Sequence, residues 1–280
     1  MKKSKRKLLK VIFAEIALIL ITIIVSLPLF LALSISFQTQ KEVFSFPPKI
    51  FPKSLYFGNY KRAFEVVPLA RLILNSLIMA GVITVGKLIT GSLAGYAFSN
   101  FKFKGKNVSF AVLFATLFLP AETVMIVPLF LIMKKFGWVN TYWALTVPFL
   151  ASATNTFLMR QHFMSIPHEL EDAARIDGAT PMQYFVKVIL PLSKAMIGGA
   201  AIINFVYAWN LYLWPLVVIM DDKMKTVQIG IKMLITGADV ARNWGVIMAG
   251  AMVALAPTVI VFLLLQNLFV KSLVKSGMKG

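Results

Sequence analysis

The chain has 280 residues, of which 59% are apolar and only 14% charged, too hydrophobic a composition for a soluble domain of this length. Its formal net charge is +18, but the basic residues are distributed between long apolar runs, which argues against a nucleic-acid-binding protein. It has no cysteine, and its two histidines, His162 and His168, lack further ligands at metal-binding spacing. We therefore expect an integral membrane protein with neither a metal nor a cofactor.

Six apolar segments are long enough to cross the hydrocarbon core of a bilayer as helices. They cover residues of about 8–34, 71–98, 108–133, 140–160, 195–220 and 245–270. The first is longer than the core of a signal peptide and no small-x-small cleavage site follows it, so we expect it to be retained. We predict an all-α, polytopic bundle of six transmembrane helices, a single membrane domain over 1–280 with a polar loop at about 161–194.

The distribution of basic residues predicts the orientation of the bundle. Lysines and arginines number 16 on the side that carries both termini and the loop 161–194, and 11 on the opposite side. Cytoplasmic loops carry the excess of positive charge in membrane proteins. Both termini and the loop 161–194 should therefore be cytoplasmic, and membrane lipid should surround the spans.

The second and third segments contain polar features that need partners in the membrane. Gly91 and Gly95 form a small-x-x-x-small pattern typical of close helix contacts. Lys87 and Glu122 lie at comparable depth, and a charge in lipid costs roughly 2.5–3.5 kcal/mol unless it is paired or hydrated. They are expected to pair; the alternative is that one of them, such as Glu122, lines a transport path.

The loop 161–194 has the local signals of two short helices joined by a corner. Ser165 is a candidate cap for the first helix, and Gly178 can adopt the left-handed conformation that ends it. Thr180 and Gln183 have the spacing of a capping box that opens the second helix. The first turn is acidic and so complements the helix dipole, through Glu169, Glu171 and Asp172.

A longer motif runs through this loop. Asp172-Ala173-Ala174 is followed by three residues, Gly178, nine residues and then Val188-Ile189-Leu190-Pro191. This spacing resembles the EAA loop of ABC-importer permeases, whose pattern is Glu-Ala-Ala, Gly and Ile-x-Leu-Pro. Asp172 stands where the family usually has Glu and keeps the negative charge. Val188 stands where the family usually has Ile and keeps an apolar side chain. The alternative is an amphipathic helix lying on the bilayer surface.

The resemblance implies that the loop couples transport to ATP hydrolysis in a partner subunit. The small side chains of Ala173 and Ala174 suit docking into a groove of that ATPase. The residues implied in coupling are Glu171, Asp172, Ala173, Ala174, Asp177, Gly178, Leu190 and Pro191. The chain itself has no phosphate-binding Gly-x-x-x-x-Gly-Lys pattern, so it should be a transport subunit without its own ATPase site.

The fifth segment contains polar and aromatic side chains suited to a hydroxylated solute. Asn204 and Asn210 can form hydrogen bonds to hydroxyl groups, and Trp209 or Trp214 can stack on a sugar ring. The alternative for a membrane asparagine is hydrogen bonding between helices. We consider Asn204, Trp209, Asn210 and Glu122 candidates for the substrate path.

About two hundred residues, from the second span onward and including 149–154 and Trp209-Asn210, resemble the second permease of carbohydrate-type ABC importers. Within them, Ala151-Ser152-Ala153-Thr154, Thr180-Pro181-Met182 and Gly230-Ile231-Lys232 look closest to glycerol-3-phosphate importers. The resemblance implies four partners in a bacterial or archaeal cell (inner) membrane: a homologous permease, two copies of a cytoplasmic ATPase and an external solute-binding protein. A maltose-type oligosaccharide is an alternative solute. An ion-coupled secondary transporter and a membrane-embedded enzyme are alternative classes, but intramembrane carboxylates and nucleophiles are too few for either.

Overall fold

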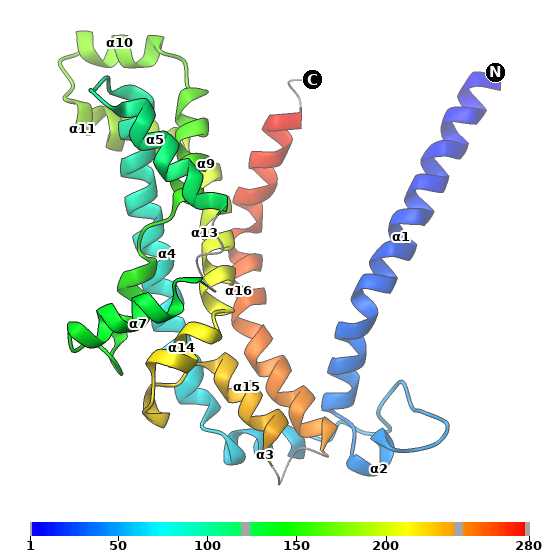
Figure 1. Cartoon of the computed structure of the whole chain (residues 1–280). Coiled ribbons are helices and arrows are strands. Elements are labelled where there is room, and N and C mark those ends of the chain that lie inside the picture. The colour runs from blue at the N-terminus through cyan, green and yellow to red at the C-terminus, as the bar shows by residue number, and fades with distance from the viewer. Residues whose placement is uncertain (1, 119–123, 238–242, 278–280) are drawn as a thin grey trace. The chain divides into compact units, whose positions relative to one another are not determined.

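The computed structural model describes residues 2–118, 124–237 and 243–277, with side chains described between residues 11 and 266. Every regular element in these ranges is a helix, which confirms the all-α class (Figure 1). The chain divides into two compact units. One unit comprises Met1–Leu69 and Ile231–Leu255, and the other Ala70–Gly230 and Ala256–Gly280.

The first unit contains α1 (Lys2–Ser36), α2 (Gln40–Val43), α3 (Gly58–Val66) and parts of α15 (Val227–Thr236) and α16 (Trp244–Gly277). Its fold depends on Asn59, whose buried Nδ2 donates to the carbonyls of Ser36 at 2.9 Å and Gln38 at 2.8 Å. A Cβ on Gly245 would lie only 2.5 Å from that same nitrogen. Close packing and two hydrogen bonds therefore hold the start of α3 to the end of α1.

The second unit is built around the long helix α4 (Leu69–Asn100). It continues with α5 (Lys106–Ala115), α7 (Ile126–Lys135), α8 (Tyr142–Thr146), α9 (Ala153–Met164), α10 (Glu169–Ile176), α11 (Pro181–Tyr184), α12 (Leu190–Leu192), α13 (Lys194–Trp209) and α14 (Leu213–Val218). Short 3-10 turns cover Thr116–Phe118, Val147–Phe149 and Asp222–Met224, and a π-helical turn covers Phe185–Ile189. In Figure 1, α10 and α11 lie beyond one end of α4.

Glycines allow α4 to pack closely against α9. A Cβ on Gly91 would lie 2.2 Å from Nδ2 of Asn155. A Cβ on Gly95 would lie 2.7 Å from Cβ of Met159 and 2.9 Å from the backbone nitrogen of Arg160. Only glycine fits at these distances, so the close helix contact predicted from the Gly91–Gly95 spacing is confirmed.

Three helical segments in the described residues are long and apolar enough to cross a membrane: Val11–Ser36, Leu69–Asn100 and Trp244–Gln266. A fourth arises if Pro181–Leu192 and Lys194–Trp209, which meet at 77°, count as one bent span. The six-span arrangement therefore stays a prediction.

The predicted spans 140–160 and 195–220 are not continuous helices but successive shorter ones, and the described parts of the predicted span 108–133 are α5 with a 3-10 turn and α7. In the predicted span 140–160, Pro148 lies in a 3-10 turn, and α9 begins afresh where Ser152 accepts a hydrogen bond from the backbone N–H of Asn155. Proline has no N–H to donate within a helix, and a serine cap favours the start of a new one. The break in this span therefore follows from Pro148 and Ser152.

Candidate functional site

The corner between α10 and α11 has the predicted local geometry. Gly178 has φ +74°, a left-handed conformation, and its N–H donates to the carbonyl of Arg175 at 3.0 Å. Thr180 Oγ1 accepts from the N–H of Gln183 at 3.2 Å, while Gln183 Oε1 accepts from the N–H of Thr180 at 2.9 Å. The acidic first turn of α10 is also present. The helix stop at Gly178 and the capping box are both confirmed.

The predicted cap at Ser165 is wrong. Ser165 ends α9, where its Oγ donates to the carbonyl of His162 at 2.7 Å. The residue before α10 is His168, which has helical backbone angles and makes no side-chain cap. α10 begins only after His168, three residues downstream of Ser165, so the Ser165 hydroxyl does not lie at the N-cap position of α10.

An aromatic core joins this corner to α4 and α13. Its buried members, called the Tyr96 core here, are Tyr96, Met159, Phe163, Ala174, Tyr184, Phe185, Ile189 and Ala200. Tyr96 stacks on Phe185 with 4.8 Å between ring centroids, and its hydroxyl donates to the carbonyl of Pro181 at 3.0 Å. Ala174 packs within this subunit, whereas Ala173 is exposed, and the expected docking role of the two alanines stays a prediction.

A polar clamp fixes α10 to the end of α4. Nδ2 of Asn100 donates to Oε2 of Glu171 at 2.8 Å, and Nη2 of Arg175 lies 2.6 Å from the other carboxylate oxygen. A hollow of about 250 Å³ surrounds the clamp. Its lining residues are Tyr96, Asn100, Phe101, Glu171, Ala174, Arg175, Ala179, Pro181 and Tyr184. Hydrogen bonds as well as packing therefore hold this part of α10 in position.

The Leu190-Pro191 part of the motif produces a bend. Pro191 has no N–H to donate to the carbonyl four residues earlier, and the preceding turn, Phe185–Ile189, is π-helical. Ser193 then ends α12; its Oγ and its N–H both donate to the carbonyl of Ile189, at 2.7 and 3.0 Å. These bonds stabilise the 77° turn into α13.

The outer face of α10, defined here as Leu170, Ala173, Ile176 and the acids Asp172 and Asp177, is exposed. The side chain of Ile176 is 87% exposed, although α10 has a buried side on which an apolar residue could pack. Apolar side chains ringed by charge are typical of protein interfaces. The sequence argument missed Ile176, although its spacing of three from Ala173 places both on one helix face.

A buried chain of polar groups connects three helices in the middle of the second unit. Nδ2 of Asn204 on α13 donates to Oδ1 of Asn155 on α9 at 3.3 Å, and Nδ2 of Asn155 donates to the carbonyl of Lys87 on α4. Nζ of Lys87 lies 3.7 Å from the ring centroid of Tyr207. Asn204 thus forms the interhelical hydrogen bond that was the alternative to substrate contact. The predicted pair with Glu122 lies outside the described residues.

Replacing Tyr207 with leucine should destabilise the bundle by about 1–2 kcal/mol, because it removes the aromatic face beneath a desolvated ammonium group. Tyr207→Phe keeps that face and should retain most of the stability. The measurement is the thermal midpoint of the purified protein in detergent. Equal losses for the two variants would contradict a role for the ring face.

The other fifth-span candidates have different environments. Trp209 is buried and stacks on Phe205 at 5.7 Å, whereas Asn210 is exposed at the end of α13. Nε2 of Gln228 on α15 donates to Oδ1 of Asn210 at 3.2 Å and to the carbonyl of Trp209 at 3.2 Å. Of the three, only Asn210 presents its side chain at a surface, with Gln228 as an unforeseen polar neighbour.

The described residues contain no group of three or more acidic or histidine side chains placed to hold a metal ion. Burial lowers the pKa of His162 at the end of α9, and its Nε2 has no hydrogen-bond partner within the described part of the chain. A buried histidine of this kind is neutral near pH 7.

Comparisons with known proteins agree with this geometry. A family model described as "Binding-protein-dependent transport system inner membrane component" matches residues 87–275. The sn-glycerol-3-phosphate transport system permease protein UgpE of Pectobacterium atrosepticum is 39% identical over 271 residues, covering 95% of this chain and 96% of the relative. The protein of the same name from Salmonella typhi is also 39% identical over 271 residues, with the same coverage.

Solved structures share the fold. A bacterial ABC transporter involved in import of the acidic polysaccharide alginate has a TM-score of 0.82 at 23% identity, covering 93% of this chain and 96% of that one. An alginate ABC transporter in complex with a pentasaccharide-bound periplasmic protein gives 0.67 at 17% identity, covering 93% and 95%. The resemblance to ABC-importer permeases is confirmed by the family and its relatives. The chain belongs to the family of inner-membrane components of binding-protein-dependent transport systems.

Proposed function

We propose that this permease imports sn-glycerol-3-phosphate as one of two homologous permease subunits, with two copies of a cytoplasmic ATPase and an external solute-binding protein. Membership of the transport family makes it a permease subunit of a binding-protein-dependent importer. The solute is supported by the names of relatives that are 39% identical over 95% of the chain. The solved structures, at 17–23% identity, support the fold and do not bear on the solute.

The observation that carries the coupling proposal is the division of α10 into two sides. Ala174 is buried in the Tyr96 core, while the outer face presents the 87%-exposed Ile176 beside Asp172 and Asp177. An ATPase groove that receives the apolar side chains and pairs its cations with the acids fits this face. Docking would then bury Ile176 without disturbing the subunit's own packing.

Movement of a docked α10 would reach the membrane helices by two routes. The hydrogen bonds from Asn100 to Glu171 and from Tyr96 to the carbonyl of Pro181 lead to α4. The π-helical turn, Leu190-Pro191 and Ser193 lead to α13. Closure of the ATPase pair around ATP would thus change the angle between these helices and switch the cavity between inward- and outward-facing states.

For the substrate path, Asn210 is the best-placed candidate, since its exposed Nδ2 donates one N–H to the carbonyl of Val206 and has a second N–H that can donate to a phosphate or hydroxyl oxygen. Asn204 and Trp209 are buried in the subunit and would act by holding helices in position. Glu122 remains a candidate on sequence grounds alone.

The solute is tested with the assembled transporter in liposomes, by measuring ATP hydrolysis stimulated by the loaded binding protein. We expect stimulation by sn-glycerol-3-phosphate and none by a maltose-type oligosaccharide. The reverse pattern would assign the chain to oligosaccharide import. Uptake without the ATPase, driven by an ion gradient, would instead indicate a secondary transporter.

We also propose six spans with both termini cytoplasmic, which introduced cysteines can test because the chain has none. Met182 is 58% exposed and makes no capping bond, so Met182→Cys should leave the corner intact. In intact cells an impermeant thiol reagent should spare Met182→Cys and label Ser54→Cys, which lies in the exposed loop after α2. Labelling of Met182→Cys from outside would reverse the orientation and end the coupling proposal.

A further inference from the structure

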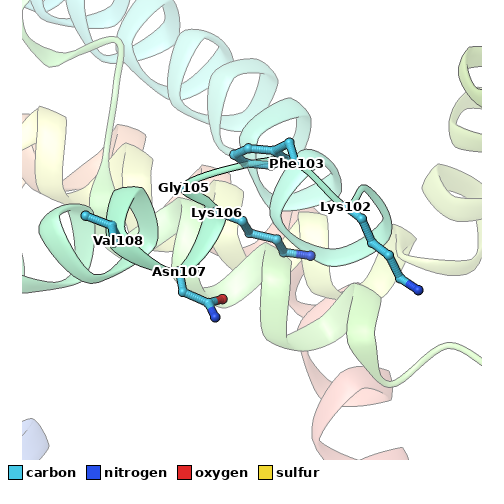
Figure 2. Close-up of a pocket in the computed structure, with 6 residues that line it drawn as sticks. All are labelled: Lys102, Phe103, Gly105, Lys106, Asn107 and Val108. Atoms are coloured by element: carbon cyan, nitrogen blue, oxygen red, sulfur yellow. The ribbon is translucent and has the colours of Figure 1, made fainter.

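The segment that joins α4 to α5 forms an open hollow of about 390 Å³ (Figure 2). It is lined by Lys102, Phe103, Gly105, Lys106, Asn107 and Val108. In Figure 2 the side chains of Lys102 and Lys106 extend toward the same side of this loop. The volume is within the range of small-molecule sites, roughly 300–1,000 Å³.

Positive charge gathers around this hollow. Lys102, Lys104 and Lys106 follow one another at alternate positions, and the sequence holds no acid between Glu65 and Glu122. Burial, followed by the charges of Arg160 and Lys102, lowers the pKa of Lys106. These like charges repel one another, so an anion in the hollow would stabilise all of them.

Within the described ranges, no acid forms an ion pair with the lysines of this loop. Nζ of Lys106 donates to the carbonyl of Phe101 at 2.8 Å, and Nε of Arg160 donates to the carbonyl of Phe98 at 3.2 Å. Both cations are thus held in place by carbonyl groups, which carry no net charge. Glu171, the acid that reaches the end of α4, already binds Arg175.

Apolar side chains lie among the cations. Phe101 is 42% exposed, Phe103 45% and Val108 68%. The loop begins directly after Asn100, where the candidate membrane span Leu69–Asn100 ends. Lysines with apolar stems and exposed aromatic rings at the end of a span are typical of a surface that meets lipid headgroups and the first part of their acyl chains.

We propose that this hollow binds the phosphate headgroup of an anionic phospholipid of the surrounding bilayer, with Lys102 and Lys106 at the phosphate and Phe103 and Val108 against the lipid's apolar part. The bound lipid reduces the repulsion between the lysines and holds the loop at the membrane surface. Because Asn100 at the end of α4 also clamps α10, lipid binding stiffens the point where α10 is attached.

The test uses the assembled transporter in nanodiscs, without ATP or solute, so that its outcome is independent of the solute proposal. A fluorophore on Asn107→Cys, which lines the hollow, reports quenching by brominated phosphatidylglycerol or brominated phosphatidylcholine. The complex without the introduced cysteine supplies the background. We expect quenching to favour the anionic lipid, and the preference to fall about fivefold for each lysine removed in K102Q and K106Q.

A matched control removes the same charge elsewhere. Lys134 and Lys135 are exposed at the end of α7, and K134Q/K135Q should leave the preference unchanged. Equal quenching by the two lipids, or an equal loss in K134Q/K135Q, would overturn the proposal. Loss of the lipid preference on adding inorganic phosphate would also overturn the proposal, because it would assign the hollow to a free anion. A lipid preference that is seen only after the ATPase is removed would overturn it as well.

Discussion

Gly95→Ala should prevent normal assembly of the permease, with a loss of about 2–3 kcal/mol in the free energy of unfolding. The added Cβ would lie 2.7 Å from Cβ of Met159 and 2.9 Å from the backbone nitrogen of Arg160. Neither atom is the end of a flexible side chain, so α4 and α9 must separate. The measurement is the yield of monodisperse protein and its thermal midpoint in detergent.

Gly81→Ala is the matched control on the same helix, because a Cβ there meets no described atom within 4 Å. The intrinsic helix preference for alanine over glycine is the same at both positions and favours the variant by about 1 kcal/mol. Gly81→Ala should therefore be neutral or stabilising. Equal thermal midpoints for the two variants would contradict the close approach of α4 and α9.

Features of the fold that depend on adjacent residues were predictable. The stop at Gly178 and the capping box of Thr180 and Gln183 need only a few residues of chain, and the structure has both. The helical class followed from the long apolar runs. The predicted cap at Ser165 was wrong because α9 extends to Met164 and α10 begins only after His168, and these boundaries depend on packing as well as on the residues next to Ser165.

Features that depend on distant residues were not predictable. Asn155 and Asn204 form a hydrogen bond although they are 49 positions apart, and the residues around each do not indicate which distant side chain it will contact. Likewise, Asn100 and Glu171 meet only because the chain returns to the end of α4. The sequence marked Asn204 as polar in an apolar segment, but packing decided that it bonds another helix.

The candidate coupling site was recognised from motif spacing, which located the segment but not which side chains face outward. Ala173 and Ala174 are equivalent in the motif, yet one is exposed and the other lies in the Tyr96 core. Ile176 is outside the motif's named positions and is more exposed than either. Helix rotation against α4 determines this difference, and rotation needs the tertiary structure.

Ile176→Asp should abolish stimulation of ATP hydrolysis by the loaded binding protein. If Ile176 occupies an apolar groove of the ATPase, aspartate brings a charge into that groove and costs about 2 kcal/mol or more, roughly thirtyfold in affinity. The side chain is 87% exposed in this subunit, so the substitution should leave insertion and the permease fold intact. Co-purification of the ATPase with the permease and the rate of stimulated hydrolysis are the measurements.

Ile176→Val provides the control, because it keeps an apolar, β-branched side chain and removes a single methylene group. It should retain most of the ATPase binding and stimulation. If the thermal midpoint falls for Ile176→Asp but not for Ile176→Val, the aspartate has impaired folding of the permease. The yield of inserted permease detects such an effect separately. Wild-type co-purification and stimulation in Ile176→Asp would show that the outer face of α10 is not the docking surface. The ATPase would then have to bind elsewhere, and the clamp between Asn100 and Glu171 would have only a structural role.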